Sequence, residues 1–205
     1  MQYWLTFWFW FITIFAFMLN FPLSLFFDYN KTFLICFKFI QLFGPIEVIC
    51  DGPPILDNSI IVSNHNTIVD FIFILIKYPN TKFAAINWSI WDYCLPLKYV
   101  FTNSGNLLFD SGNSYAQIKE WIQDTPDSPI WIFPTGSIVN NEVHSGAFSI
   151  AGDLKKTIKI VKIENIKNVF NRNGFIRDLH PVRIRFVESG ADGNYMKSKF
   201  EEIMQ

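Results

Sequence analysis

The chain of 205 residues has few charged side chains, and this shortage narrows the functions that it can have. Charged residues make up 17% of the sequence, against about 25% in an average globular protein, whereas hydrophobic residues make up 50%. The formal net charge is −1. Because the chain lacks the basic excess that attracts a polyanion, we expect no nucleic-acid partner.

Cysteines are also scarce, and the common catalytic motifs are absent. Cys36, Cys50 and Cys94 lack the spacing of a metal site or a disulfide framework, so they are expected to be small apolar residues in a reducing compartment. The chain has no P-loop, no glycine-rich dinucleotide fingerprint, no H-E-x-x-H and no G-x-S-x-G. No metal ligands are predicted.

The first 27 residues contain no charged side chain at all. A helix over residues 3–27 is about 37 Å long at 1.5 Å per residue, enough to cross a hydrocarbon core of about 30 Å. Pro22 is expected to bend or end this helix. The stretch lacks the basic start and the small-residue cleavage site of a signal peptide, so it is predicted to remain as a membrane helix. Aromatic residues near its start suit a membrane interface: Tyr3, Trp4, Trp8 and Trp10.

A second apolar stretch, Thr32–Gly44, is short for a membrane span and carries a single charge, on Lys38. It fits an interfacial helix beside the first one and, equally, a buried helix of a globular domain. Lys31 and Lys38 follow the first helix, whereas nothing basic precedes it. The two apolar stretches together predict an integral membrane protein with transmembrane or interfacial helices over residues 1–44. The positive-inside tendency places its main domain on the cytosolic side.

From residue 45 onward, short apolar runs alternate with helical patterns. Strands are expected at Ile46–Cys50, Ile60–Ser63, Lys82–Ile86, Asn106–Asp110, Pro129–Phe133, Thr157–Ile163 and Val182–Val187. Helices are expected at Thr67–Tyr78, Ser114–Asp124, Gly146–Lys155 and Tyr195–Met204. This alternation predicts one α/β domain over residues 45–205, with a mixed or mostly parallel sheet flanked by helices.

The segment Ile60–Leu75 reads as a strand, a polar loop and an apolar helix, and it contains His65 and Asp70. On one continuous helix this spacing turns about 500°, so the two side chains would point about 140° apart. If His65 precedes the helix, its ring can fold back over the first turn and lie beside the carboxylate, as in a general base. Alternatively, Thr67-x-x-Asp70 is a capping box, and Asp70 only holds the start of the helix.

Four short blocks, in their order and separation, resemble the lysophosphatidic acid acyltransferase family of glycerophospholipid acyltransferases. Asn64–Asp70 matches the first block of the family, N-H-x-x-x-x-D. Gly105–Ser111 lies where a glycine, apolar strand residues and an arginine are expected, and Ile132–Ser137 lies where F-P-E-G-T-R is expected. Gly146–Ala151 resembles the G-A-F-x-x-A helix that follows. The resemblance covers roughly residues 45–190 and implies the α/β fold of these acyltransferases.

The resemblance implies a membrane-bound O-acyltransferase, similar to 1-acylglycerol-3-phosphate O-acyltransferases of phospholipid biosynthesis. Such an enzyme moves a fatty acyl group from acyl-CoA or acyl carrier protein to a hydroxyl of a lysophospholipid-like acceptor. By resemblance His65 is the base that takes the hydroxyl proton and Asp70 orients it. The implied partners are membrane lipids, the lysolipid acceptor and the acyl thioester, with acyl-CoA as co-substrate and no cofactor. Substrate-binding positions carried over from the blocks are Asn66, Gly105, Phe109, Ser111, Phe133, Pro134, Thr135, Gly136 and Ser137.

The chain departs from the family pattern at residues that would handle a phosphate. Ser111 replaces an arginine, Thr135 replaces a glutamate, and Ser137–Ile138 stand where threonine and arginine are expected. Serine cannot reproduce the bidentate contacts of an arginine with phosphate. Two hypotheses therefore stay open: an active acyltransferase with a different acceptor, and a non-catalytic membrane protein of the same fold that binds acyl chains or acyl-CoA. Alternative cations for the site are Lys82, Lys98, Lys155, Lys156, Arg172 and Arg177.

Overall fold

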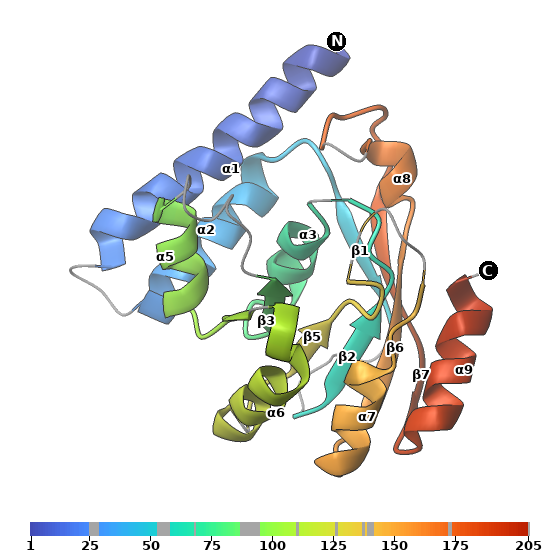
Figure 1. Cartoon of the computed structure of the whole chain (residues 1–205). Helices are drawn as coiled ribbons and strands as arrows, with labels where there is room; N and C mark the ends of the chain where they lie inside the picture. Colours follow the sequence, from blue (N-terminus) through green and yellow to red (C-terminus); the bar gives the residue numbers. More distant parts are fainter. Residues whose placement is uncertain are drawn as a thin grey trace.

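In the described part of the chain, seven strands form one mixed sheet in the order β1-β7-β6-β2-β5-β3-β4 (Figure 1). The computed structural model describes residues 1–24, 29–52, 58–67, 69–86, 95–109, 111–125, 127–136, 138, 142–171 and 174–204. The strands are β1 (Val48–Asp51), β2 (Ile60–Ser63), β3 (Lys82–Ile86), β4 (Leu107–Phe109), β5 (Ile130–Ile132), β6 (Ile158–Glu164) and β7 (Val182–Gly190). Strands β2 to β6 run parallel, β7 is antiparallel to β6, and β1 is parallel to β7. The predicted mixed α/β fold is confirmed.

Helices cover both faces of the sheet because successive strand residues point to opposite sides. Ile60 and Val62 of β2 face the cluster under one group of helices, whereas Ile61 faces the other cluster. The first group is α6 (Ser114–Asp124), α7 (Gly146–Asp153) and α9 (Gly193–Met204). The second group is α1 (Gln2–Ser24), α2 (Tyr29–Phe43), α3 (Asp70–Lys77), α5 (Leu95–Asn103) and α8 (Ile166–Val169).

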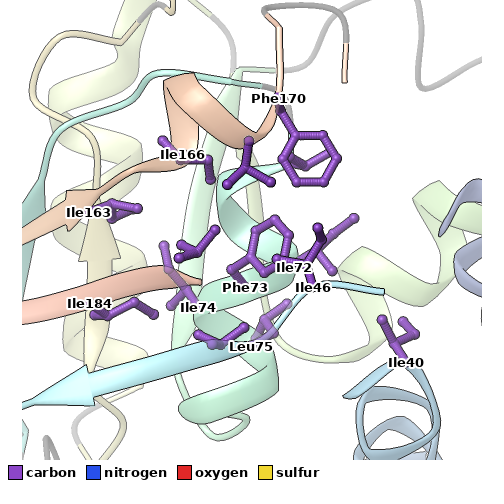
Figure 2. Packing of buried hydrophobic residues seen from close by; sticks show 14 of the residues in the cluster. Ile40, Ile46, Ile72, Phe73, Ile74, Leu75, Ile163, Ile166, Phe170 and Ile184 are labelled. Atoms are coloured by element: carbon purple, nitrogen blue, oxygen red, sulfur yellow. The ribbon is translucent and has the colours of Figure 1, made fainter. Parts of the chain in front are cut away.

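Helix α3 lies at the centre of the larger cluster, between the sheet and the pair formed by α1 and α2. Figure 2 shows Ile72, Phe73 and Leu75 of α3 surrounded by side chains from the sheet, α2 and the region of α8. Four consecutive residues of α3, Ile72 to Leu75, are buried, so the helix is covered on all sides. The start of α3, where Asp70 lies, is therefore anchored in the core of the fold.

Element boundaries differ from the prediction where side chains or backbone conformation decide them. Helix α3 begins at Asp70 and not at Thr67, because the preceding residues turn around the Asp70 carboxylate. Helix α7 ends at Asp153 because Lys155 takes a left-handed conformation with φ of 52°. Pro22 lies inside α1, whose described residues run to Ser24. The short helices α5 and α8 were not predicted, and Cys94 lies outside the described residues.

Helix α1 is long and apolar enough to cross a membrane, but one side of it packs on the sheet domain. Phe9, Ile12 and Ala16 are buried, and the Phe9 ring lies 6.0 Å from Phe73 and 5.1 Å from Phe170, centroid to centroid. The other side carries exposed large apolar residues: Tyr3, Trp4, Phe7, Trp8, Phe11, Ile14, Phe15, Met18 and Leu19.

Helix α2 combines the two readings of the second apolar stretch. Its Cys36 and Ile40 are buried in the same cluster as the sheet residues, whereas Ile35, Leu42 and Phe43 are exposed. The division of the chain at residue 44 stays a prediction, but the buried sides of α1 and α2 are part of the core of the sheet domain.

Gly174 shows how closely the segment after α8 fits against α1. Its φ is +78°, and an added Cβ would lie 2.7 Å from Cζ2 of Trp10. A side chain here therefore meets both an unfavourable backbone conformation and a steric clash. We expect Gly174→Ala to lower the free energy of unfolding by roughly 1–3 kcal/mol, measured by denaturant unfolding of the full chain in detergent.

Gly112 provides the matched control, because no atom lies within 4 Å of an added Cβ there. Gly112→Ala should leave the unfolding midpoint close to that of the wild type. Equal midpoints for the two alanine variants would show that the contact between Gly174 and Trp10 does not constrain the structure.

Candidate active site

The sheet topology brings two of the predicted blocks together at the carboxyl ends of β2 and β5. These strands are parallel neighbours, with Val62 opposite Ile132. The chain leaves β2 toward α3 on one face and leaves β5 toward α7 on the opposite face. In α/β sheets, ligands bind at such a reversal of connection. The loop containing His65 follows β2, and Phe133–Gly136 follows β5, so both lie at this position.

His65 and Asp70 form a direct pair. Nδ1 of His65 lies 2.9 Å from Oδ2 of Asp70, and the side chain of Asp70 is fully buried while that of His65 is 21% exposed. As the spacing argument required, His65 precedes the helix and its ring folds back over the first turn of α3. Since the carboxylate accepts at Nδ1, the ring nitrogen that remains to take a proton is Nε2.

The same carboxylate holds the loop together. Its Oδ2 accepts hydrogen bonds from the backbone N–H of Asn66 at 2.6 Å and of Thr67 at 3.2 Å, and its Oδ1 accepts from the Thr67 hydroxyl at 2.6 Å. The two alternatives considered for Asp70, a partner of the histidine and an anchor of the helix start, are thus both present in the geometry. The loop that carries His65 is fixed by the group that orients its ring.

Two residues that the sequence did not single out as site residues fasten this loop to the sheet. The Asn64 side chain pairs with the backbone of Ile163 in β6: its Nδ2 donates to the carbonyl at 2.8 Å, and its Oδ1 accepts from the N–H at 2.7 Å. The Ser63 hydroxyl accepts from Trp131 Nε1 at 2.8 Å. Buried polar residues directly after an apolar strand were the available signal, because such groups need internal partners.

Phe133 stacks against the imidazole. The two ring centroids are 4.2 Å apart with an interplanar angle of 19°, and Phe83 follows 6.3 Å beyond Phe133. Phe133 was predicted to contact substrate by its position in the third block. The structure places it against His65, where it fixes the plane of the ring while Asp70 fixes its rotation.

The turn after Phe133 completes this side of the site. The N–H of Gly136 donates to the Phe133 carbonyl at 2.9 Å, and the φ of +59° at Gly136 favours glycine. Pro134 and Thr135 are buried, and the Pro134 carbonyl accepts from the N–H of the exposed His144 at 3.0 Å. Pro134, Thr135 and Gly136 thus follow the residue that stacks on His65, whereas Ser137 lies outside the described residues.

Gly105 does not lie beside His65, so its role in substrate binding stays a prediction. It precedes β4 and therefore lies at the end of the sheet where the parallel strands begin, opposite the end at which His65 lies. The pairing of Ala84 with Leu107 places it level with Lys82, whose side chain lies 3.4 Å from an added Cβ. Phe109 is the last residue of β4 and lies at the same end of the strands as His65. However, β3 separates β4 from β5, and Phe109 packs toward the cluster under α6, α7 and α9. Ser111 begins the 3-10 helix beyond it.

The proposed substitute cations lie mostly away from His65. Lys82 donates to the Ser104 carbonyl at the end of the sheet where the parallel strands begin, and burial lowers the pKa of its ammonium. Lys155 and Lys156 line a cavity of about 490 Å³ at this same end of the sheet, between α6 and the end of α7. Arg177 follows α8 and is exposed at the end of the sheet where His65 lies, whereas Arg172 is outside the described residues.

No protein-family model matches the chain, and no curated protein matches its sequence. Its structure is similar to the crystal structure of the 1-acyl-sn-glycerophosphate (LPA) acyltransferase PlsC from Thermotoga maritima, with a TM-score of 0.76 over 99% of this chain and 94% of that chain. The two chains share one fold. They are 15% identical in sequence, so the likeness with PlsC establishes the architecture and not the chemistry.

Proposed function

We propose that this protein is a membrane-bound O-acyltransferase that moves a fatty acyl group from acyl-CoA, or from acyl carrier protein, to a hydroxyl of a lysophospholipid-like acceptor. The observation that carries this proposal is the contact of 2.9 Å between His65 Nδ1 and the buried carboxylate of Asp70. The pair lies at the reversal of connection in a sheet whose fold is shared with PlsC.

In the proposed reaction, His65 is the general base. Its Nε2 takes the proton of the acceptor hydroxyl while the oxygen attacks the thioester carbonyl, which forms a tetrahedral intermediate. The intermediate collapses to the new ester and expels the thiolate, which receives the proton from the imidazolium. Asp70 stabilises the imidazolium through Nδ1. Proton transfer by a positioned histidine typically accelerates such a step by about 10²–10⁴-fold.

A second function, binding of acyl chains or acyl-CoA without transfer, is favoured by the turn after β5. Thr135 is 2% exposed at this turn, where the resembling family has a glutamate. A buried hydroxyl has neither the charge nor the acid–base chemistry of a carboxylate. The paired His65 and Asp70 favour catalysis over this second function, because simple binding of an acyl chain does not need a base.

Membrane attachment through α1 is part of the proposal. The exposed side of α1 is apolar and aromatic beyond Gln2, whereas Thr6, Thr13 and Asn20 are buried against the protein. Asn20 Nδ2 donates to Thr32 Oγ1 of α2 at 3.3 Å. The outward side therefore suits a lipid environment, with the domain on the cytosolic side as the flanking lysines favour. Because Phe9 and Ile12 belong to the core, removing α1 would disturb folding as well as attachment.

The direct test is product formation by the purified full chain in mixed micelles. Isotope-labelled long-chain acyl-CoA is supplied with lysophosphatidate, lysophosphatidylcholine or monoacylglycerol, and lipids are analysed by mass spectrometry. We expect a labelled diacyl product with at least one acceptor, and preferentially with one that lacks the terminal phosphate, since no arginine takes the two block positions. Saturable acyl-CoA binding without any product would instead establish the second function, and neither binding nor product would refute both.

A further inference from the structure

The segment that follows α8 is fastened along one side of α1 by three hydrogen bonds. Gln2 Nε2 donates to the Arg177 carbonyl at 2.6 Å, the Ile176 N–H donates to Thr6 Oγ1 at 2.9 Å, and Trp10 Nε1 donates to the Gly174 carbonyl at 3.0 Å. Residues four apart lie on the same side of a helix. Figure 1 shows this loop close to the amino-terminal end of α1. We call residues 174–180 the flanking segment.

The backbone of the flanking segment buries Ile176 and leaves Phe175, Arg177 and the residues up to His180 exposed. Ile176 is buried and forms a β-bridge with Phe170, and the Arg177 N–H donates to the Val169 carbonyl at 2.7 Å. Phe175 is consequently 47% exposed and Leu179 is 45% exposed. Two large apolar side chains thus lie four residues apart on the surface of one short segment, and grouped apolar side chains on a surface mark a contact site, whereas single ones do not.

Cations accompany these apolar side chains. Arg177 is exposed on the flanking segment, and Lys167 is exposed on α8, which leads into it. The one carboxylate of the flanking segment, on Asp178, lies 3.1 Å from His180 Nε2. Exposed apolar residues beside lysine and arginine are the combination that binds an anionic lipid surface, where each cation strengthens the attraction.

The flanking segment also touches the residue that precedes Asp70. Gly174 is wedged between Trp10 and Val69: an added Cβ would lie 3.4 Å from the Val69 side chain, and Val69 directly precedes Asp70. The side of α1 that holds the segment borders its exposed apolar side, on which Tyr3 and Phe7 lie. A bilayer that covers the exposed side of α1 therefore reaches the flanking segment and, next to it, the start of α3.

We propose that the flanking segment, together with Lys167, is a second lipid-contacting surface that binds the headgroups of anionic phospholipids. Phe175 and Leu179 enter the interface, and Arg177 and Lys167 meet lipid phosphates. The proposal rests on the membrane attachment of the proposed function and is independent of acyl transfer. Its occupant is a bilayer because the segment continues the exposed apolar side of α1.

The test is binding of the full chain to vesicles of phosphatidylcholine alone and of phosphatidylcholine mixed with phosphatidylglycerol. We expect the wild type to bind the anionic vesicles more tightly. The variant Lys167→Gln/Arg177→Gln should lose this preference, by roughly fivefold in affinity for each cation removed, and should bind neutral vesicles as the wild type does. Phe175→Ser/Leu179→Ser should weaken binding to both kinds of vesicle. Circular dichroism verifies that each variant is folded.

The matched control is Lys197→Gln/Lys199→Gln, which removes two cations from α9 on the other face of the sheet and should keep the preference. A wild type without preference for anionic vesicles, or a Lys167→Gln/Arg177→Gln variant that keeps it, would overturn the proposal and leave a protein partner as the occupant of this surface. Vesicle binding needs no turnover, so failure of acyl transfer and failure of this proposal are separate results.

Discussion

Replacement of His65 by alanine is expected to lower the rate of acyl transfer by about 10²–10⁴-fold, which is the usual contribution of a positioned general base. Asp70 cannot replace the imidazole as the base, because its carboxylate is fully buried and accepts hydrogen bonds from the loop. The loss should appear in kcat, since the base acts in the transition state and not in the binding of either substrate. The measurement is thiol release from acyl-CoA in micelles at saturating acceptor.

The fold should survive this substitution. The side chain of His65 is partly exposed, and the Asp70 carboxylate keeps its bonds to Asn66 and Thr67 when the ring is removed. An unfolding midpoint close to that of the wild type is therefore the control. A folded His65→Ala protein that turns over at the wild-type rate would show that the reaction does not pass through this histidine.

Replacement of Asp70 by alanine is expected to lower the free energy of unfolding by about 3–5 kcal/mol, the usual cost of removing one partner from a buried charged network. The substitution leaves two backbone N–H groups and the buried Thr67 hydroxyl without their acceptor, and it frees His65 to rotate. Asp70→Asn keeps the shape and one acceptor oxygen, so its cost should be smaller, although its activity should fall because the imidazolium loses its counter-charge.

Asp153 is the control for this prediction. It is an exposed carboxylate paired with Lys119 and Tyr115, and exposed pairs contribute little to stability. Asp153→Ala should therefore destabilise the protein far less than Asp70→Ala in the same denaturant experiment. If the two variants unfold at similar denaturant concentrations, the Asp70 carboxylate does not organise the loop as the structure indicates.

The pairing of His65 with Asp70 could be predicted from sequence because it depends on local chain geometry. A spacing of five residues excludes a contact within one helix but allows one across a helix start. The double role of Asp70 could not be chosen in advance, because the capping motif and the histidine contact are compatible only in a particular loop conformation. The clamp from Asn64 to Ile163 joins residues 99 positions apart and depends on strand order.

Gly105 shows the opposite case. The order of the four blocks along the chain suggested that Gly105 lies in the site. The order of residues in a sequence does not say at which end of the strands a residue lies. A residue that precedes a parallel strand and one that follows it are separated by the length of that strand. Helix α1 was predicted from composition, whereas the side that packs on the domain was not. The spacing of Thr6, Thr13 and Asn20 at seven-residue intervals was the available signal for that side.

In the proposed mechanism, Asp70 fixes the tautomer of His65, with the proton on Nδ1 directed to the carboxylate and a bare Nε2. The most direct test is the ¹⁵N chemical shifts of the imidazole in the full chain, assigned by their loss in His65→Ala and measured at a pH where the ring is neutral. The proposed mechanism predicts a protonated Nδ1 and an unprotonated Nε2. A His65 ring with its proton on Nε2 would contradict it, because that nitrogen could not then accept the proton of a hydroxyl.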